Sequence, residues 1–196
     1  VPPAVLCGVF CCRLIHSTTT WIVFAYAILS RLAYVLFVGG ALRREEGAGD
    51  EAFRRFRRRA AWVMNHDGFA FILLCVVTRN TWSLPFSPFA TVTVGVILAG
   101  LGVGTKLWAA RTLGGDADYW HNFFDPDEAI GRVTSGPYRF IANPMYTIGY
   151  LHTYGLALML RSFPGFIAAV FSQAAILAFY FIVERPHFRR LHKPTL

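Results

Sequence analysis

The chain has 196 residues, of which 55% are hydrophobic and 15% are charged, and its formal net charge is +8. Soluble domains carry about a quarter charged residues, so this composition argues against an ordinary soluble domain and favours an integral membrane protein. Residues 1–15 have no charged segment ahead of their apolar run, which argues against a secretory signal peptide.

Several segments are apolar enough to cross about 30 Å of hydrocarbon, which requires about 20 helical residues. They are Trp21–Leu42, Ala60–Val77, Pro88–Ala110, Met145–Leu160 and Pro164–Val183. The polar run Asn65-His66-Asp67 interrupts the second segment, and the fourth is short. We therefore predict an all-α, multi-pass bundle of about five transmembrane spans, whose last two helices form a hairpin.

The basic residues are concentrated in three of the connections. Seven arginines lie in the loop 43–59, and the tail after Val183 adds Arg185, Arg189, Arg190 and Lys193. The segment between residues 110 and 143 adds Arg111, Arg132 and Arg139. The positive-inside rule places these three segments in the cytosol and the N-terminus on the other side of the membrane. Because the arginines flank spans, we expect contact with lipid rather than with nucleic acid.

The basic loop interleaves arginine with phenylalanine over Phe53–Arg57. This pattern suits an interfacial amphipathic helix, and a solvated charged loop is the alternative. Two further charges lie inside spans, Arg31 in the first and Asp67 in the second. Intramembrane charges are costly and usually paired, so we expect a structural Arg31–Asp67 ion pair.

Two polar, proline-marked segments adjoin the last two spans. Gly136–Tyr146 precedes the fourth span, and Val183–Phe188 follows the fifth. A helix hairpin would bring Asn143, Tyr146 and Glu184 to the same membrane surface. In a membrane protein, such a place can hold a polar small molecule without exposing backbone to lipid, so we predict a ligand site there.

Two other patterns admit a structural and a functional interpretation. Gly100 and Gly102 lie within the third span, where small residues usually allow helices to approach closely. The segment 114–136 mixes acidic residues with aromatic ones, which suits either a cation-binding rim or an interfacial aromatic belt. The cysteines form no Cys-x-x-Cys pair, and Cys12 and His16 would supply only two ligands, so we predict no metal site.

Taken in order, these motifs carry a resemblance to a known family. Gly100-Leu-Gly102 is followed by Leu113–Phe124, then by Asn143-Pro-Met-Tyr146 and by Glu184-Arg-Pro-His-Phe188. This order resembles the integral-membrane phospholipid N-methyltransferases, in particular the fungal phosphatidylethanolamine N-methyltransferases. It is similar, more distantly, to isoprenylcysteine carboxyl methyltransferases. The resemblance covers roughly residues 95–190, so we expect an N-terminal transmembrane region in residues 1–90 and a methyltransferase core in residues 91–196.

The resemblance implies an enzyme that uses S-adenosylmethionine to methylate the amine of a membrane phospholipid such as phosphatidylethanolamine. The expected location is the cytosolic face of a bacterial inner membrane or of the endoplasmic reticulum. The resemblance also implies that the cofactor pocket contains Gly100, Gly102, Asn143, Pro144, Tyr146 and Glu184. Arg139 or Arg185 could meet the cofactor's carboxylate. Relatives often carry two acidic residues where this chain has Glu184-Arg185.

Methyl transfer to an amine requires a neutral nitrogen lone pair, so a base must first remove a proton. The candidate bases are His121, Asp118, Asp116 and Glu184, of which His121 has the most suitable unperturbed pKa. The ring of Tyr146 could steady a cation.

Two other reactions remain open, esterification of a carboxylate as in isoprenylcysteine methyltransferases and a sterol-type membrane reduction. A carboxylate acceptor needs no deprotonation, which separates it from an amine. A non-enzymatic membrane scaffold is the remaining alternative.

Overall fold

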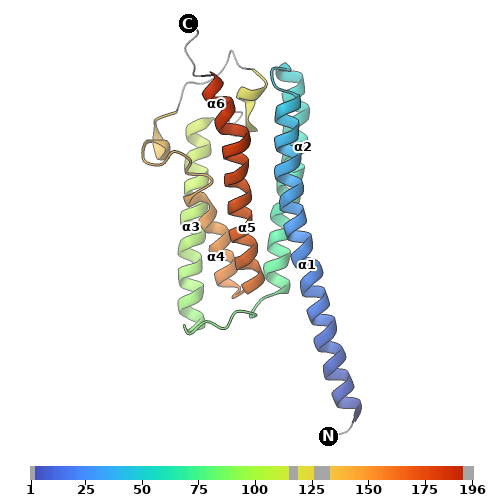
Figure 1. Cartoon of the computed structure of the whole chain (residues 1–196). Coiled ribbons are helices and arrows are strands. Elements are labelled where there is room, and N and C mark those ends of the chain that lie inside the picture. Colours follow the sequence, from blue (N-terminus) through green and yellow to red (C-terminus); the bar gives the residue numbers. More distant parts are fainter. Residues whose placement is uncertain (1–2, 115–118, 126–132, 192–196) are drawn as a thin grey trace.

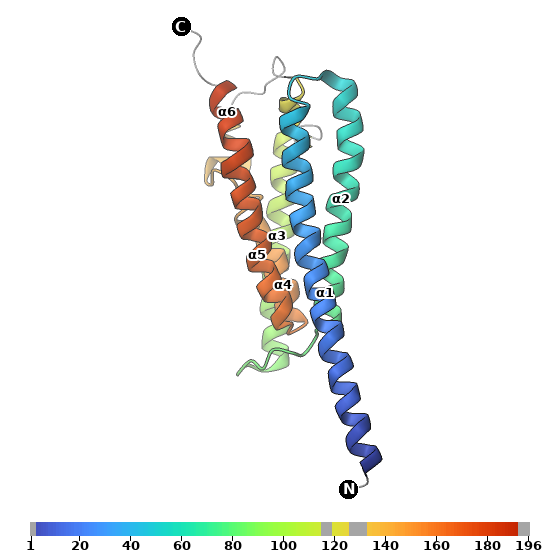
Figure 2. The same ribbon diagram turned by 45° about the vertical axis from the view of Figure 1, so that its right-hand side comes forward.

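The computed structural model describes residues 3–114, 119–125 and 133–191, and the side chains from residue 18 to residue 190 within these ranges. This part of the chain is helical and contains no strand, which confirms the all-α prediction. The main helices are α1 (Pro3–Arg44), α2 (Gly49–Val77), α3 (Pro88–Leu113), α4 (Leu151–Met159), α5 (Phe163–Phe179) and α6 (Arg185–Leu191). The helices pack side by side in one bundle (Figures 1 and 2).

Four helical segments are long and apolar enough to cross a membrane, namely Thr18–Arg44, Gly49–Val77, Pro88–Leu113 and Phe163–Arg190. The shortest has 26 residues, which gives it a length of about 39 Å at 1.5 Å per residue. Large apolar side chains such as Leu36, Phe89 and Ile182 are more than half exposed on the outside of the bundle. Such exposure is costly in water and suits a lipid environment, so the chain is an integral membrane protein.

The second span begins earlier than predicted, because most of the basic loop is helical. Only residues 45–48 connect α1 to α2, and Arg54–Arg59 lie in the first turns of α2. The polar run within this span does not break the helix, because each side chain has a partner. Asn65 donates to the carbonyl of Ala61, His66 bonds Tyr26 and Ser30 of α1, and Asp67 pairs with Arg31. The predicted Arg31–Asp67 pair is confirmed, with an N–O distance of 2.5 Å.

The fourth crossing differs from the long helix expected over Met145–Leu160. α4 has nine residues, so it is only about 14 Å long, and the short 3-10 turn Ile148–Tyr150 leads into it. Asn143-Pro144 and Gly149 interrupt the helical pattern, and Gly149 donates to the carbonyl of Pro144 instead. Irregular backbone at this depth is tolerated where protein rather than lipid surrounds it. In the described part of the chain, four helices rather than the predicted five are therefore long enough to span by themselves, and α1 begins at the opposite end of the bundle from α6 (Figure 1).

α4 and α5 form the predicted hairpin, and α4 packs closely against α3. A Cβ atom added at Gly102 of α3 would come 2.3 Å from the backbone nitrogen of His152. A Cβ atom at Gly155 of α4 would come 2.5 Å from the carbonyl oxygen of Gly95. Glycine at these positions lets the two backbones approach each other, as small residues do in membrane helix pairs.

We expect Gly102→Ala to lower stability, because the new methyl group would meet backbone atoms that cannot move aside. Overpacking of this kind costs about 1–3 kcal/mol. The neighbouring Gly100→Ala variant is the matched control, because a Cβ atom at Gly100 has nothing within 4 Å. Thermal unfolding in detergent should show a lower midpoint for Gly102→Ala only. Equal midpoints for the two variants would contradict the close α3–α4 contact.

Candidate active site

Glu184 is a buried carboxylate at the end of the last long helix. It closes the π-helical turn Tyr180–Glu184 between α5 and α6, and only 6% of its surface is exposed. Trp120 Nε1 donates to Glu184 Oε1 at 2.6 Å, and the Tyr146 hydroxyl donates to the same oxygen at 2.5 Å. A wider turn of this kind inside an α-helix often occurs at functional sites.

Both of these hydrogen bonds end on one oxygen of the carboxylate. Among the residues that the structure describes, none donates a hydrogen bond to Glu184 Oε2. An ionised carboxylate can accept about four hydrogen bonds over its two oxygens, so Glu184 retains unused capacity. A buried charge normally requires further partners, and a ligand that carries N–H or O–H groups would provide them.

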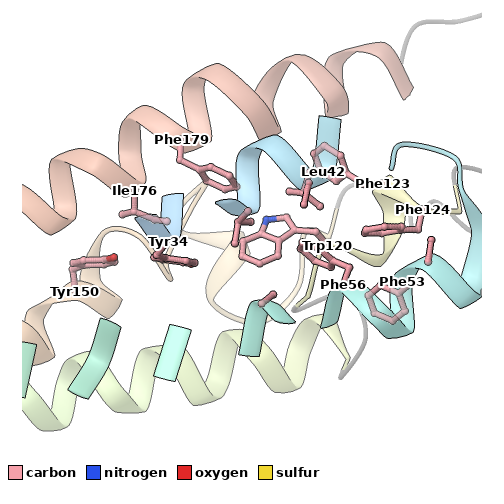
Figure 3. Packing of buried hydrophobic residues seen from close by; sticks show 14 residues of the cluster. Tyr34, Leu42, Phe53, Phe56, Trp120, Phe123, Phe124, Tyr150, Ile176 and Phe179 are labelled. Carbon is pink, nitrogen blue, oxygen red and sulfur yellow. The ribbon is translucent and has the colours of Figure 1, made fainter. Parts of the chain in front are cut away.

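Trp120 reaches Glu184 because of its backbone conformation and its packing. Its φ of 60° is left-handed, and it precedes the 3-10 turn His121–Phe123. Its indole packs between Phe56 of α2 and Phe179 of α5, with ring centroids 6.3 and 5.7 Å away (Figure 3). The aromatic cluster therefore fixes the indole N–H that holds Glu184.

Tyr146 is positioned by a hydrogen-bonded turn. Asn143 Oδ1 accepts from the backbone N–H of Tyr146 at 3.3 Å, and the hydroxyl of Thr147 donates to the carbonyl of Asn143. Gln173 of α5 donates to the carbonyls of Tyr146 and Thr147, and Tyr154 donates in turn to Gln173. The turn is thus attached to α5, which explains how a segment without regular helix holds a side chain against Glu184.

The structure brings together part of the predicted site. The predicted proximity of Asn143, Tyr146 and Glu184 is confirmed, with Asn143 acting through the turn. Pro144 is fully buried beside them. Arg139 and Arg185 are exposed, and their guanidinium groups lie 5.9 Å from the ring centroid of Phe140 and 5.5 Å from that of Phe181, respectively.

Other predicted residues lie elsewhere. Gly100 is exposed, and Gly102 is buried against α4, where close packing already explains the need for glycine. His121 Nε2 lies 3.1 Å from Asp50 Oδ1, and its ring packs on Phe53, near the start of α2. Asp116 and Asp118, and the side chains of Cys12 and His16, lie outside the described part of the structure.

The sequence pattern indicated no role for His187, which joins α6 to two other segments through a set of contacts that we call the His187 clasp. The ring is 1% exposed and stacks on Phe123 at 3.7 Å between centroids. Its Nδ1 lies 2.9 Å from Glu46 Oε1, and its Nε2 lies 3.2 Å from the carbonyl oxygen of Asn122. Arg190 also donates to Glu46. These contacts tie α6 to the α1–α2 connection and to the segment that carries Trp120.

The backbone of the same segment is attached to the α1–α2 connection. The N–H groups of Gly47 and Gly49 donate to the carbonyls of Phe123 and Phe124 at 2.8 and 3.0 Å. Residues from three distant parts of the chain therefore enclose Glu184 at one end of the bundle. The fold is that of a helical integral membrane protein. Its site is a buried carboxylate at the end of the last long helix, with hydrogen bonds to only one of its two oxygens among the described residues.

Comparison with known proteins identifies the family. A family profile described as phospholipid methyltransferase matches residues 90–195, which is more than half of the chain. The chain therefore belongs to the phospholipid methyltransferase family. No solved structure matches the chain significantly.

Two of the curated relatives carry the same name. Phosphatidylethanolamine N-methyltransferase of Chaetomium globosum is 34% identical over 144 residues, which cover 71% of this chain and 15% of the relative. The protein of the same name from Pyricularia oryzae is 30% identical over 142 residues, again 71% of this chain and 14% of the relative. The chain thus spans about one seventh of the length of these relatives. Neither name favours a prenylcysteine methyltransferase or a sterol reductase.

Proposed function

We propose that this chain transfers methyl groups from S-adenosylmethionine to the amine of a phospholipid such as phosphatidylethanolamine. The observation that carries the proposal is the buried Glu184, held on Oε1 by Trp120 and Tyr146 and left with Oε2 to bind a ligand. Family membership and the names of the fungal relatives support the reaction class. We also propose that residues 91–196 form the methyltransferase core and that residues 1–90 form a supporting transmembrane region.

The residues of the site fit the groups that S-adenosylmethionine presents. When bound, this cofactor supplies an electrophilic methyl group on a sulfonium. Glu184 Oε2 would accept from its ammonium or from its ribose hydroxyls, which are the donors that a buried carboxylate prefers. The exposed guanidinium of Arg139 or Arg185 would pair with its carboxylate. Asn143 and Pro144 would act indirectly, by holding Tyr146.

The reaction then requires positioning and removal of one proton. The phospholipid amine loses a proton to a base and attacks with its lone pair, so that an N–C bond forms as the S–C bond breaks. The aromatic ring of Tyr146 would lie near the cation. We retain His121, Asp118 and Asp116 as candidate bases, with Glu184 as the alternative. Gly100 and Gly102 remain proposed pocket residues, although packing alone explains Gly102.

The proposal is tested by incubating purified protein with methyl-labelled S-adenosylmethionine and a panel of acceptors. We expect label in mono-, di- or trimethylated phosphatidylethanolamine. The rate should fall below neutral pH, because the amine and its base become protonated. Transfer to a prenylcysteine carboxylate instead would overturn the proposed acceptor and leave the proposed cofactor standing. Transfer to neither would overturn both.

We propose that the Glu184 end of the bundle faces the cytosol. Arg43, Arg44, Arg54–Arg59 and Arg185–Arg190 all belong to this end, and the positive-inside rule retains such residues on the cytosolic side. Single cysteines at Ala48 and Thr195, in a variant whose native cysteines are replaced, should both react with an impermeant reagent from the cytosolic side. Reaction of the two from opposite sides would contradict the five-crossing arrangement.

A further inference from the structure

A second polar surface lies on the first turns of α2, next to the Glu184 site but separate from it. The helix has two distinct faces there. Ala52, Phe53, Phe56 and Ala60 are buried, and Phe56 and Phe53 pack on Trp120, His121 and Phe124. Arg54, Arg57 and Arg58 are exposed on the opposite face. The buried face fixes the helix, so the arginines are presented on a rigid support rather than on a loop.

The exposed face borders an open groove. Its walls are formed by Arg54, Arg57, Arg58, Ala61 and Tyr119, together with the Glu51–Arg55 ion pair. The guanidinium of Arg57 lies 5.2 Å from the ring centroid of Tyr119, so this aromatic ring orients one of the arginines. The groove is therefore built from two segments that are distant in sequence.

Among the described residues of the groove, the single glutamate, Glu51, is already bound to Arg55 at 2.5 Å. Neither Arg54 nor Arg58 has a carboxylate partner within the described part of the chain. Like charges at positions i and i+4 of a helix repel each other. An anion from outside the chain would remove this repulsion.

The position of the groove relative to the membrane surface indicates which anion is available to it. Trp62, one turn beyond Arg58, is 78% exposed, and such a tryptophan is typical of the membrane–water interface. The phosphates at this depth belong to lipid headgroups, and guanidinium groups bind phosphate through two parallel hydrogen bonds. A surplus of positive charge favours a lipid with net negative charge over a zwitterionic one.

We propose that this groove binds the headgroup of an anionic phospholipid of the surrounding bilayer, distinct from the phospholipid that accepts methyl groups. Arg54 and Arg58 hold the phosphate, and Arg57 closes the site against Tyr119. Because Tyr119 adjoins Trp120, the bound lipid lies beside the segment that holds Glu184. This inference does not depend on the proposed methyl transfer.

Native mass spectrometry in mixed micelles of phosphatidylglycerol and phosphatidylethanolamine tests the proposal. The unaltered protein should retain phosphatidylglycerol preferentially. The Arg54→Gln/Arg58→Gln double variant should bind it about a hundredfold more weakly, since the loss of a hydrogen bond to a charged group lowers affinity about tenfold or more per arginine. Arg111→Gln/Arg189→Gln is the matched control, because it removes two exposed charges from the same end of the bundle but outside the groove.

Each outcome is decisive. Loss of phosphatidylglycerol in the first double variant, with retention in the control, supports the groove. An equal loss in both variants would indicate attraction to net charge alone and overturn the proposal, as would equal retention in both. Displacement of the lipid by inorganic phosphate at matched ionic strength would show a site for free phosphate rather than for a lipid headgroup. Circular dichroism should show unchanged helix content, because both arginines are exposed.

Discussion

Replacing Glu184 by glutamine is expected to weaken S-adenosylmethionine binding by about ten- to a hundredfold. Glutamine has nearly the same shape and can still accept from Trp120 and Tyr146 through its amide oxygen. It presents an NH2 group in place of Oε2, however, so a bond to a cationic or hydroxyl donor is lost together with the charge. A hydrogen bond to a charged group contributes about 1.5–3 kcal/mol, which corresponds to this range of affinities.

Calorimetric titration of the purified protein with S-adenosylmethionine measures the effect directly, without dependence on the acceptor. Glu45→Gln is the control, because Glu45 lies in the connection between α1 and α2 rather than beside Trp120 and Tyr146. It should leave the affinity unchanged. Unaltered affinity in Glu184→Gln would remove this residue from the cofactor pocket and leave the reaction class supported by family membership alone.

Some of this site could be predicted from sequence, because a helix hairpin has few degrees of freedom. Tyr146 and Glu184 flank two consecutive apolar segments, and an antiparallel pair must return its outer ends to the same level. Their contact followed from that arrangement. The Arg31–Asp67 pair was predictable for a similar reason, since two charges at similar depth in adjacent spans have few other partners.

Neither the hydrogen bond from Trp120 to Glu184 nor the contacts of His187 could be predicted from the sequence. Trp120 reaches Glu184 only because its backbone is left-handed and because Phe56 and Phe179 enclose the indole. His187 contacts Glu46, which lies 141 residues earlier in the chain, in the connection between α1 and α2. Hydropathy locates the spans but does not predict the backbone path of such a connection. The short α4 was missed because Met145–Leu160 is mostly apolar, whereas local hydrogen bonds at Asn143 and Gly149 determine where the helix begins.

Removing the carboxylate of Asp67 is expected to cause the largest loss of stability. Asp67 and Arg31 are both more than nine-tenths buried, and Arg31 also donates to the Tyr150 hydroxyl at 3.0 Å. The pair therefore links α1, α2 and the turn before α4. In Asp67→Ala, the guanidinium of Arg31 would remain buried with that one neutral partner. Breaking a buried pair by removing one partner costs about 3–5 kcal/mol.

The exposed Glu51–Arg55 pair is the matched control for this loss. Its N–O distance is also 2.5 Å, but its side chains are 78% and 50% exposed, whereas those of Asp67 and Arg31 are 6% and 9% exposed. An exposed i,i+4 pair contributes only about 0.3–0.5 kcal/mol, so Glu51→Ala should barely change the unfolding midpoint in detergent. Burial rather than distance then accounts for the difference between the two variants.

A double replacement separates the cost of an unpaired charge from the value of the pair. Arg31→Met combined with Asp67→Leu removes both charges and keeps apolar volume, and such replacements are often neutral or stabilising. We expect the double variant to unfold at a higher temperature than Asp67→Ala alone. If Asp67→Ala were no less stable than Glu51→Ala, water would have to reach Arg31, and the interior between α1 and α2 would be hydrated rather than closed. If the double variant were as unstable as Asp67→Ala, the ion pair itself would be what holds α1, α2 and the α4 turn together.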